Sequence, residues 1–439
     1  MAKKTLQLVK EIAHRMRFPN RVEHVASQNA IEAWEPQFLA GGSPGLIVLF
    51  SELANLFPDE KWDEAVHFYI LKIKQNLEEK WSGDLSLFNG LSGICFAIQT
   101  ASKQGTRYQK ILTKLDQFLL ERVQTQYINP INTALSKGYR LHVDYYDLMS
   151  GIIGIGVYAL KNKRLARFTE LTEKILKTLI ELIKPIEIQG VLVPGWYLPS
   201  EYQMLEEEKK FYPNGSFNFG LAHGVTGILA FFAIASIQGF KVSGLQDCIG
   251  HISHYLIKNR RQLRGSYFWD TIISFEDEVR SLRTQNCFFR DAWCYGSPSV
   301  SRALFLAGKA LQESEIQSFA IESFKSIFSR TMSEWNIPGP TFCHGLSGLL
   351  SFTHLFAIES KDNDLVEKAA FIEARILELY HPNHPFGFQD QHLIPNRGLI
   401  FVDSPGLLQG AAGVLLSLLT RETGCQDWMW PFMINDGCF

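Results

Sequence analysis

Residues 224–235 read GVTGILAFFAIA, with two glycines three residues apart at the start of a run that is apolar at nearly every position. A run of this length without a polar face is typical of a helix that is buried on all sides. The pattern recurs with both glycines at Gly42, Gly90, Gly151, Gly224, Gly345 and Gly410, and with Ser299 in the second glycine position at Gly296. The first glycines lie about 61 residues apart on average, so the chain is predicted to contain seven repeats.

Amphipathic stretches separate these apolar runs, the clearest being residues 63–81, 109–123, 171–183 and 313–332. One polar face suits a helix at the surface. A buried helix alternating with a surface helix predicts an all-α fold, an α/α toroid (barrel) of seven inner and seven outer helices. The glycines would let loops and neighbouring helices approach closely. Because every first glycine would lie at the same end of the barrel, the residues before the glycines should gather around one mouth.

Residues 189–216 interrupt the helical pattern with Val, Trp, Tyr, Pro and Gly, which predict strands and turns. We expect a small strand-containing insertion near the mouth that helps to hold a substrate. Length alone would suggest about three domains. The repeats instead predict that residues 1–439 form a single toroid domain.

The composition excludes several classes of protein. Lys and Arg number 43 against 45 Asp and Glu, so the basic excess of a nucleic-acid-binding surface is missing. Residues 1–18 predict an amphipathic helix rather than a signal peptide. The apolar stretches 217–240 and 398–420 contain glycines and predict buried segments rather than membrane spans. Seven scattered cysteines favour reduced thiols and a cytoplasmic location.

Chemically active side chains concentrate before the first glycines of four consecutive repeats. They are Asp147 before Gly151 (with Asp144 close by), His223 before Gly224, Arg290, Cys294 and Tyr295 before Gly296, and Cys343 and His344 before Gly345. This concentration at one predicted mouth indicates a functional site.

Two kinds of chemistry fit these residues. Cys294, Cys343 and His344 are a typical zinc ligand set, and three protein ligands leave a fourth position open, as in catalytic sites. His223 suits a general acid–base whose tautomer Asp147 fixes.

Structural roles fit the same residue types. Buried cysteines are common in cores, His223 suits a capping position, Arg290 suits a surface ion pair with Asp291, and Tyr295 suits packing. The other cysteines have no clustered partner and are expected to be structural: Cys95, Cys248, Cys287, Cys425 and Cys438.

Four motifs together resemble the lanthionine synthetase C-like family, in particular the stand-alone lantibiotic cyclases of the nisin and subtilin type. They are YDLMSGIIG (146–154), LAHG (221–224), RDAWCYG (290–296) and CHG (343–345). The resemblance extends from Gly42 to Gly413. It implies a zinc-dependent α/α toroid that closes (methyl)lanthionine thioether rings by Michael-type addition of precursor-peptide Cys thiolates to dehydroalanine or dehydrobutyrine.

The resemblance also implies the role of each residue. One zinc per chain would be bound by Cys294, Cys343 and His344, and the catalytic residues would be His223, Asp147, Arg290 and Tyr295. Whether His223 deprotonates the thiol, protonates the enolate or does both stays open. The implied partners are a dehydrated precursor peptide, a dehydratase and an ABC transporter, the last two in a complex at the inner membrane face, without nucleic acid.

Two other classes of function compete with a cyclase. One is a non-catalytic LanC-like protein that binds glutathione or a peptide. The other is an α/α toroid that processes glycosides or terpenes, which would need paired acidic residues or an Asp-rich motif, and thiol ligands argue against it. The zinc content of the protein separates these hypotheses.

Overall fold

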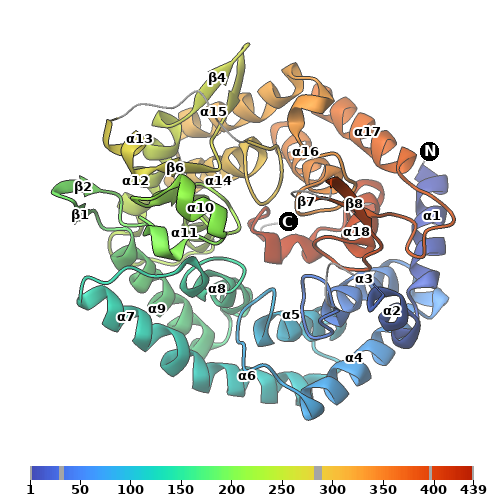
Figure 1. The fold of residues 1–439 in the computed structure, drawn as a ribbon. Coiled ribbons are helices and arrows are strands. Elements are labelled where there is room, and N and C mark those ends of the chain that lie inside the picture. Colours follow the sequence, from blue (N-terminus) through green and yellow to red (C-terminus); the bar gives the residue numbers. More distant parts are fainter. Residues whose placement is uncertain (1, 29–33, 281–288, 395–397, 438–439) are drawn as a thin grey trace. The chain divides into compact units, whose positions relative to one another are not determined.

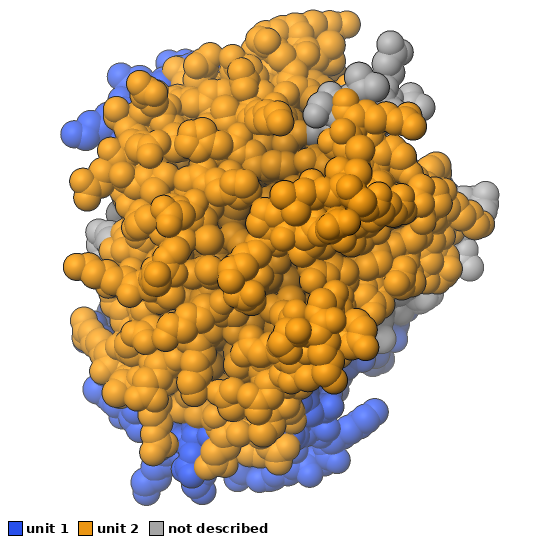
Figure 2. Space-filling model, turned by 90° about the vertical axis from the view of Figure 1, so that its left-hand side faces the viewer, with its two compact units in different colours: residues 1–117, 337–429 blue, residues 118–336, 430–439 orange. Residues whose placement is uncertain are grey.

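The structure is a computed structural model that describes residues 2–28, 34–280, 289–394 and 398–437. The chain divides into two compact units, which are coloured separately in Figure 2. Unit 1 comprises residues 1–117 and 337–429, and unit 2 comprises residues 118–336 and 430–439. Each unit is described by itself below.

Every repeat begins as predicted: the first glycine of each copy directly precedes a helix whose side chains are almost all buried. These inner helices are α3 (Ser43–Leu56), α5 (Leu91–Ala101), α8 (Ile152–Lys161), α11 (Val225–Ile237), α14 (Ser297–Leu311), α16 (Leu346–Ser360) and α18 (Ala411–Thr423). In unit 1, α16, α18, α3 and α5 pack side by side in this order, and in unit 2, α11 packs against both α8 and α14.

Amphipathic helices cover the inner ones, as Figure 1 shows for α17 and α4 in unit 1 and for α9 and α12 in unit 2. The outer helices are α1 (Ala2–Arg15), α4 (Trp62–Glu79), α6 (Gln109–Val123), α9 (Ala166–Leu182), α12 (Leu245–Lys258), α15 (Ser314–Lys325) and α17 (Asn363–Glu378). The partner of α18 is α1, from the other end of the chain. The α1 side chains Val9, Ile12 and Ala13 are fully buried, as is Met16 directly after the helix.

The remaining elements are short. The helices are α2 (Pro19–Ala26), α7 (Asn129–Ser136), α10 (Glu206–Phe211) and α13 (Phe275–Arg280). Four antiparallel strand pairs are β1 (Ile186–Ile188) with β2 (Val191–Val193), β3 (Ser216–Asn218) with β6 (Ile272–Ser274), β4 (Arg261–Leu263) with β5 (Ser266–Phe268), and β7 (Asp390–Ile394) with β8 (Gly398–Val402). The insertion at 189–216 contains β2 and the first residue of β3, as predicted, but the expectation that it is non-helical is wrong, because α10 lies within it.

The apolar stretch 398–420 is not one helix, since it divides between β8 and α18. None of the helices in the described residues combines the length and the apolar character needed to cross a membrane.

The second glycine lies against the loop that precedes its own helix in four pairs, at Gly45, Gly93, Gly227 and Gly413. A Cβ at Gly93 would stand 2.0 Å from the carbonyl oxygen of Leu87, and one at Gly413 would stand 2.1 Å from that of Leu407. Side chains of the preceding repeat approach the same glycines: Leu39 Cβ would lie 2.8 Å from a Cβ at Gly93. The spacing of the glycines thus reflects a loop that folds back onto the first turn of the helix.

We predict opposite effects for alanine at two helical glycines. Gly93→Ala should lower the free energy of unfolding by about 1–3 kcal/mol, because the backbone carbonyl of Leu87 cannot move away without shifting the loop. Gly250→Ala in α12 should leave stability unchanged or raise it by about 0.5–1 kcal/mol, because a Cβ there meets no atom within 4 Å. Thermal unfolding of both variants tests this, and equal melting temperatures would contradict the packing role of Gly93.

Backbone hydrogen bonds join the loops before successive inner helices. In unit 2, Leu148 N donates to Ala222 O (3.1 Å), and Leu221 N donates to Cys294 O (2.9 Å). In unit 1, Cys343 N donates to Leu408 O (2.9 Å). Leu408 N in turn donates to Ala40 O (2.8 Å), and Ala40 N donates to Phe88 O (3.2 Å). In unit 2, the loops that carry Asp147, His223 and Cys294 therefore lie side by side, and in unit 1 the loop that carries Cys343 lies beside the loop before α18.

Candidate functional site

The loops before α8 and α11 in unit 2 hold an imidazole against a carboxylate. His223 Nδ1 lies 2.6 Å from Asp147 Oδ2. The other oxygen of Asp147 accepts hydrogen bonds from the backbone N–H groups of Ser150 (2.7 Å) and Gly151 (2.9 Å) at the start of α8. Asp144 is exposed and pairs with His142 instead. Of the two predicted acidic candidates, Asp147 is thus the one that orients His223.

The pKa of His223 follows from this arrangement. Burial by itself would lower the pKa of the imidazole, but the hydrogen bond and the charge of Asp147 outweigh that effect, with smaller contributions from Cys294 and Asp144. The pKa of His223 is consequently raised above its ordinary value. His223 keeps 20% of its side-chain surface exposed, whereas Asp147 keeps none. The pair can therefore hold a proton and present it to a bound molecule.

Tyr295 follows Cys294 in the loop before α14 and is fixed by Asn218, which the sequence analysis did not single out. Asn218 Oδ1 accepts a hydrogen bond from Gly220 N (2.8 Å), so its amide group donates to the Tyr295 hydroxyl oxygen (3.1 Å). Gly220 also leaves room for the ring of Tyr295, since a Cβ there would stand 2.6 Å from it. Burial raises the pKa of Tyr295, so the phenol keeps its proton and its hydroxyl can donate a hydrogen bond.

Arg290 is half-buried at the start of the same loop. The loop turns so tightly that a Cβ at Gly296 would stand 1.6 Å from the carbonyl oxygen of Arg290, and Gly296 has a positive φ of 105°. Only glycine adopts such a conformation at little cost. The structure thus places Arg290, Cys294 and Tyr295 on one glycine-dependent turn.

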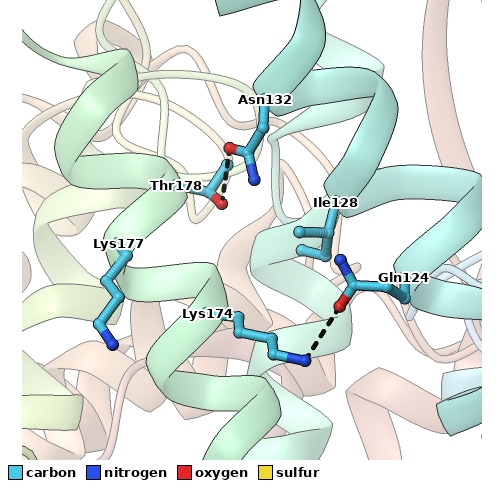
Figure 3. Close-up of a pocket in the computed structure, with 6 residues that line it drawn as sticks. All are labelled: Gln124, Ile128, Asn132, Lys174, Lys177 and Thr178. Carbon is cyan, nitrogen blue, oxygen red and sulfur yellow. Dashed lines mark hydrogen bonds between the residues drawn. The ribbon is translucent and has the colours of Figure 1, made fainter.

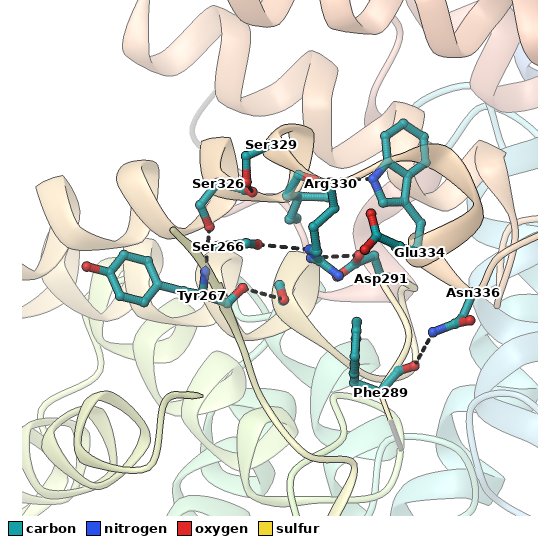
Figure 4. A network of polar contacts seen from close by, with 12 residues as sticks. Ser266, Tyr267, Phe289, Asp291, Ser326, Ser329, Arg330, Glu334 and Asn336 are labelled. Carbon is teal, nitrogen blue, oxygen red and sulfur yellow. Dashed lines mark hydrogen bonds and ion pairs between the residues drawn. The ribbon is translucent and has the colours of Figure 1, made fainter. Parts of the chain in front are cut away.

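Asp291 anchors this turn through a buried ion pair, shown in Figure 4. Its Oδ2 lies 2.8 Å from Arg330, whose Nε donates to Ser266 Oγ (2.8 Å), and the two charged side chains are 0% and 3% exposed. The backbone N–H of Asp291 donates to Trp335 O (2.9 Å). Burial raises the pKa of Asp291 to about 6, although Arg330 opposes that shift.

We predict that Arg330→Leu lowers the free energy of unfolding by about 3–5 kcal/mol at pH 7.5, because a carboxylate is left buried without its partner. Without Arg330 the pKa of Asp291 rises further above 6, so the carboxyl becomes neutral in mild acid and the loss should shrink at pH 5. Thermal unfolding relative to the wild type at both pH values measures this difference. The control is Arg264→Leu, since Arg264 is 81% exposed beside Glu334 and should change stability little. An equal loss at both pH values would contradict the prediction.

In unit 1, Cys343 and His344 lie in the loop before α16. His344 Nε2 is 3.5 Å from Asp390 Oδ2 on strand β7, and His392 Nε2 is 2.9 Å from the same oxygen. Thr341 Oγ1 donates to the other carboxylate oxygen (2.5 Å). Burial would raise the pKa of Asp390, but these three neighbours outweigh it and hold the pKa well below its usual range.

The donor set suits a soft metal ion. The five cysteines in the described part of the chain are thiols, and Cys287 and Cys438 lie outside it. A buried carboxylate beside His344 is the arrangement that metal-binding imidazoles commonly have, and thiols and imidazoles are the donor types that zinc prefers. Cys294 belongs to unit 2, whereas Cys343 and His344 belong to unit 1. Among the described residues, no three His, Cys, Asp or Glu side chains are grouped so that they could hold a metal ion.

Two surface pockets lie away from these loops. One of about 400 Å³ in unit 2, shown in Figure 3, is lined by Gln124, Ile128, Asn132, Lys174, Lys177 and Thr178. The other, of about 510 Å³ in unit 1, is lined by Asp63, Glu64, His67, Phe68, Arg107 and Tyr108. Neither lining includes a predicted site residue. The candidate site therefore consists of the loops that precede the inner helices.

Comparison with known proteins agrees with this description. The lanthionine synthetase C-like protein family matches residues 33–434. The nisin biosynthesis protein NisC of Lactococcus lactis subsp. lactis is 28% identical over 358 residues, which are 80% of this chain and 81% of that protein. The solved structure of nisin cyclase matches with a TM-score of 0.77 and 22% identity, over 99% of this chain and 97% of that one.

The likeness to nisin cyclase confirms the predicted all-α class and α/α toroid fold. The chain belongs to the lanthionine synthetase C-like family. With the match to NisC, this makes it an enzyme of the lanthionine cyclase class.

Sequence reasoning missed four residues around the site: Asn218, Arg330, Asp390 and His392. Asn218 could have been found from its place in NFGLAHG, two residues before a glycine that receives Tyr295. Asp390 and His392 alternate along a strand, so both side chains lie on one face of it. Arg330 leaves no local signal, because its partner Asp291 is reached only through tertiary packing.

Proposed function

We propose that this chain forms lanthionine and methyllanthionine rings in a dehydrated lantibiotic precursor peptide, with one zinc held by Cys294, Cys343 and His344. The observation that carries this proposal is the 2.6 Å contact between His223 and the buried Asp147, because it provides a positioned proton donor. The family membership and the thiol–imidazole donor set support it.

The reaction is a Michael-type addition that balances without a further reagent. The thiol of a peptide Cys loses its proton, its sulfur forms a bond to Cβ of dehydroalanine or dehydrobutyrine, and the alkene electron pair moves to give an enolate. A proton then adds to Cα. When bound, zinc with two thiolate ligands would favour the thiolate form of the peptide Cys while leaving its sulfur nucleophilic.

The protein's own residues divide the remaining work. The raised pKa of His223 favours the protonated imidazole, which delivers its proton to Cα. Asp147 orients the ring of His223. The Tyr295 hydroxyl donates to the developing enolate oxygen, since Asn218 already occupies its acceptor side, and Arg290 adds positive charge.

The partners that we propose are the precursor peptide, a dehydratase that prepares it, and an ABC transporter. We propose a cytoplasmic location, with attachment to the inner membrane face through that complex. No nucleic acid takes part, in agreement with the net charge of −2.

Two apolar side chains of the insertion are exposed and available to a peptide. Leu192 on β2 is 72% exposed and Phe211 at the end of α10 is 75% exposed. Replacing both with Ser should weaken binding of the precursor peptide several-fold and leave the zinc content unchanged, as measured by fluorescence anisotropy and metal analysis. The matched control is Leu165→Ser, a 55% exposed side chain between α8 and α9. Unchanged peptide affinity would contradict a role for this surface.

Ring closure is an isomerisation, so the test counts thiols rather than mass. A peptide with one Cys and one dehydroalanine is incubated with zinc-loaded protein, then alkylated with N-ethylmaleimide and weighed by mass spectrometry. We expect the unalkylated fraction to grow with protein concentration. The alternative, a non-catalytic protein that binds glutathione or a peptide, predicts binding while every peptide thiol stays reactive. That result would refute the cyclase proposal.

A further inference from the structure

Strand β7 presents two ionisable side chains to the loop that carries His344. Asp390 and His392 are two positions apart, so they project from the same face of the strand. His392 lies 2.9 Å from Asp390 Oδ2, and its ring is 6.0 Å from that of His344, centre to centre. All these residues belong to unit 1.

The carboxylate of Asp390 is buried, with 1% of its side chain exposed. Burying a lone carboxylate is costly, so its neighbours must compensate for the charge. Both oxygens face the loop before α16: Oδ1 accepts the hydrogen bond from Thr341, and Oδ2 lies 3.5 Å from His344 Nε2. Thr341 stands two residues before Cys343, so Asp390 is tied to the same loop at two points.

We propose that Asp390 is a positioning residue for the metal ligand His344: its Oδ2 lies 3.5 Å from Nε2 of the ring, which favours the proton at Nε2 and leaves Nδ1 as the atom available to zinc. His392 and Thr341 keep the carboxylate in place. This inference rests on the proposed function, because it takes His344 as a zinc ligand.

The physical basis is the tautomer of a neutral imidazole, which carries one N–H and one acceptor nitrogen. A carboxylate at Nε2 favours the proton at that nitrogen and leaves Nδ1 with its lone pair. It also restrains rotation of the ring and increases the basicity of the ligand. Removing such a carboxylate commonly weakens metal binding by roughly 10- to 100-fold.

The test measures zinc binding rather than turnover. Asp390→Asn keeps the shape of the side chain and removes its charge. We expect zinc affinity to fall about 10- to 100-fold in competition with a chromophoric chelator at pH 7. The matched control is Asp403→Asn, at the residue that directly follows Val402, the β8 residue that pairs with Asp390. The Asp403 carboxylate accepts a hydrogen bond from Gln389 (3.0 Å), so the zinc affinity of this variant should equal that of the wild type.

A purely structural role would not change the metal's ligand field, so the second readout is the visible spectrum of the cobalt-substituted protein. We expect the d–d bands to shift in Asp390→Asn and to stay in place in Asp403→Asn. If Asp390→Asn fails to fold, Thr341→Val removes only the hydrogen bond to Oδ1 and should weaken zinc binding in the same direction.

The outcomes separate this inference from the proposed function. Wild-type zinc affinity and an unchanged cobalt spectrum in folded Asp390→Asn, or wild-type affinity in Thr341→Val, would overturn the role of Asp390 while leaving a zinc enzyme intact. A wild-type protein that binds no zinc would overturn the metal assignment itself.

Discussion

Replacing His223 by Ala lowers the rate of thioether formation by about 10²- to 10⁴-fold, the usual loss when a general acid–base is removed. The variant should still bind zinc and peptide, because His223 contributes neither a proposed metal ligand nor a core side chain. The measurement is the number of peptide thiols left for alkylation over time, with zinc content determined on the same sample. Closure at the wild-type rate would remove His223 from its proposed role.

Asp147→Asn tests the same proton donor through pH. The groups that set the pKa of His223 are Asp147 and, more weakly, Cys294 and Asp144, while burial acts in the opposite direction. An amide at position 147 can still accept the hydrogen bonds at the start of α8, but it no longer favours the imidazolium. The pKa of His223 should fall, so the loss of activity on the alkaline side should move to lower pH. Asp144→Asn is the matched control, and identical profiles for all three proteins would contradict the Asp147–His223 pair.

Cys343→Ala abolishes both zinc binding and ring closure. The wild type should contain about one zinc per chain, since Cys294, Cys343 and His344 form one ligand set with an open fourth position. Loss of one thiolate from three protein ligands should leave the variant without zinc after dialysis against a weak chelator. Elemental analysis and the alkylation assay measure the two effects on the same preparation.

Cys95→Ala provides the control for this experiment, because Cys95 is a fully buried thiol in α5 that the sequence assigns to structure. It should keep its zinc and its activity. Zinc retained by Cys343→Ala at the wild-type level would show that the metal, if present, is bound elsewhere.

The paired glycines were sufficient to predict the helical framework. At Gly45, Gly93, Gly227 and Gly413 a Cβ would collide with the loop that precedes the helix, so the start of these helices can be recognised in the sequence without knowledge of distant contacts. The paired glycines also identified the loops that carry Asp147, His223, Cys294 and Cys343. Backbone hydrogen bonds join the first three of these loops in unit 2, and join the loop of Cys343 to the loop before α18 in unit 1.

What the sequence did not reveal depends on contacts between distant segments. The hairpin β7–β8 brings Asp390 to His344, yet neither Asp390 nor His392 stands near a paired glycine. Arg330 follows α15 and reaches Asp291 only after both segments have packed. Residues 1–18 were predicted to form an amphipathic helix, but an amphipathic pattern does not say which helix its apolar stripe will cover.

The contact of α1 with α18 has a consequence for how the chain is made. The buried side chains Val9, Ile12 and Ala13 of α1 are synthesised long before residues 411–423, which form the helix α18 that α1 contacts. At a synthesis rate of roughly 5–20 residues per second, α1 waits about 20–80 s for its partner. During that interval the apolar face of α1 is exposed on the growing chain, where chaperones can bind it. The last repeat can assemble only when both α1 and α18 have been made.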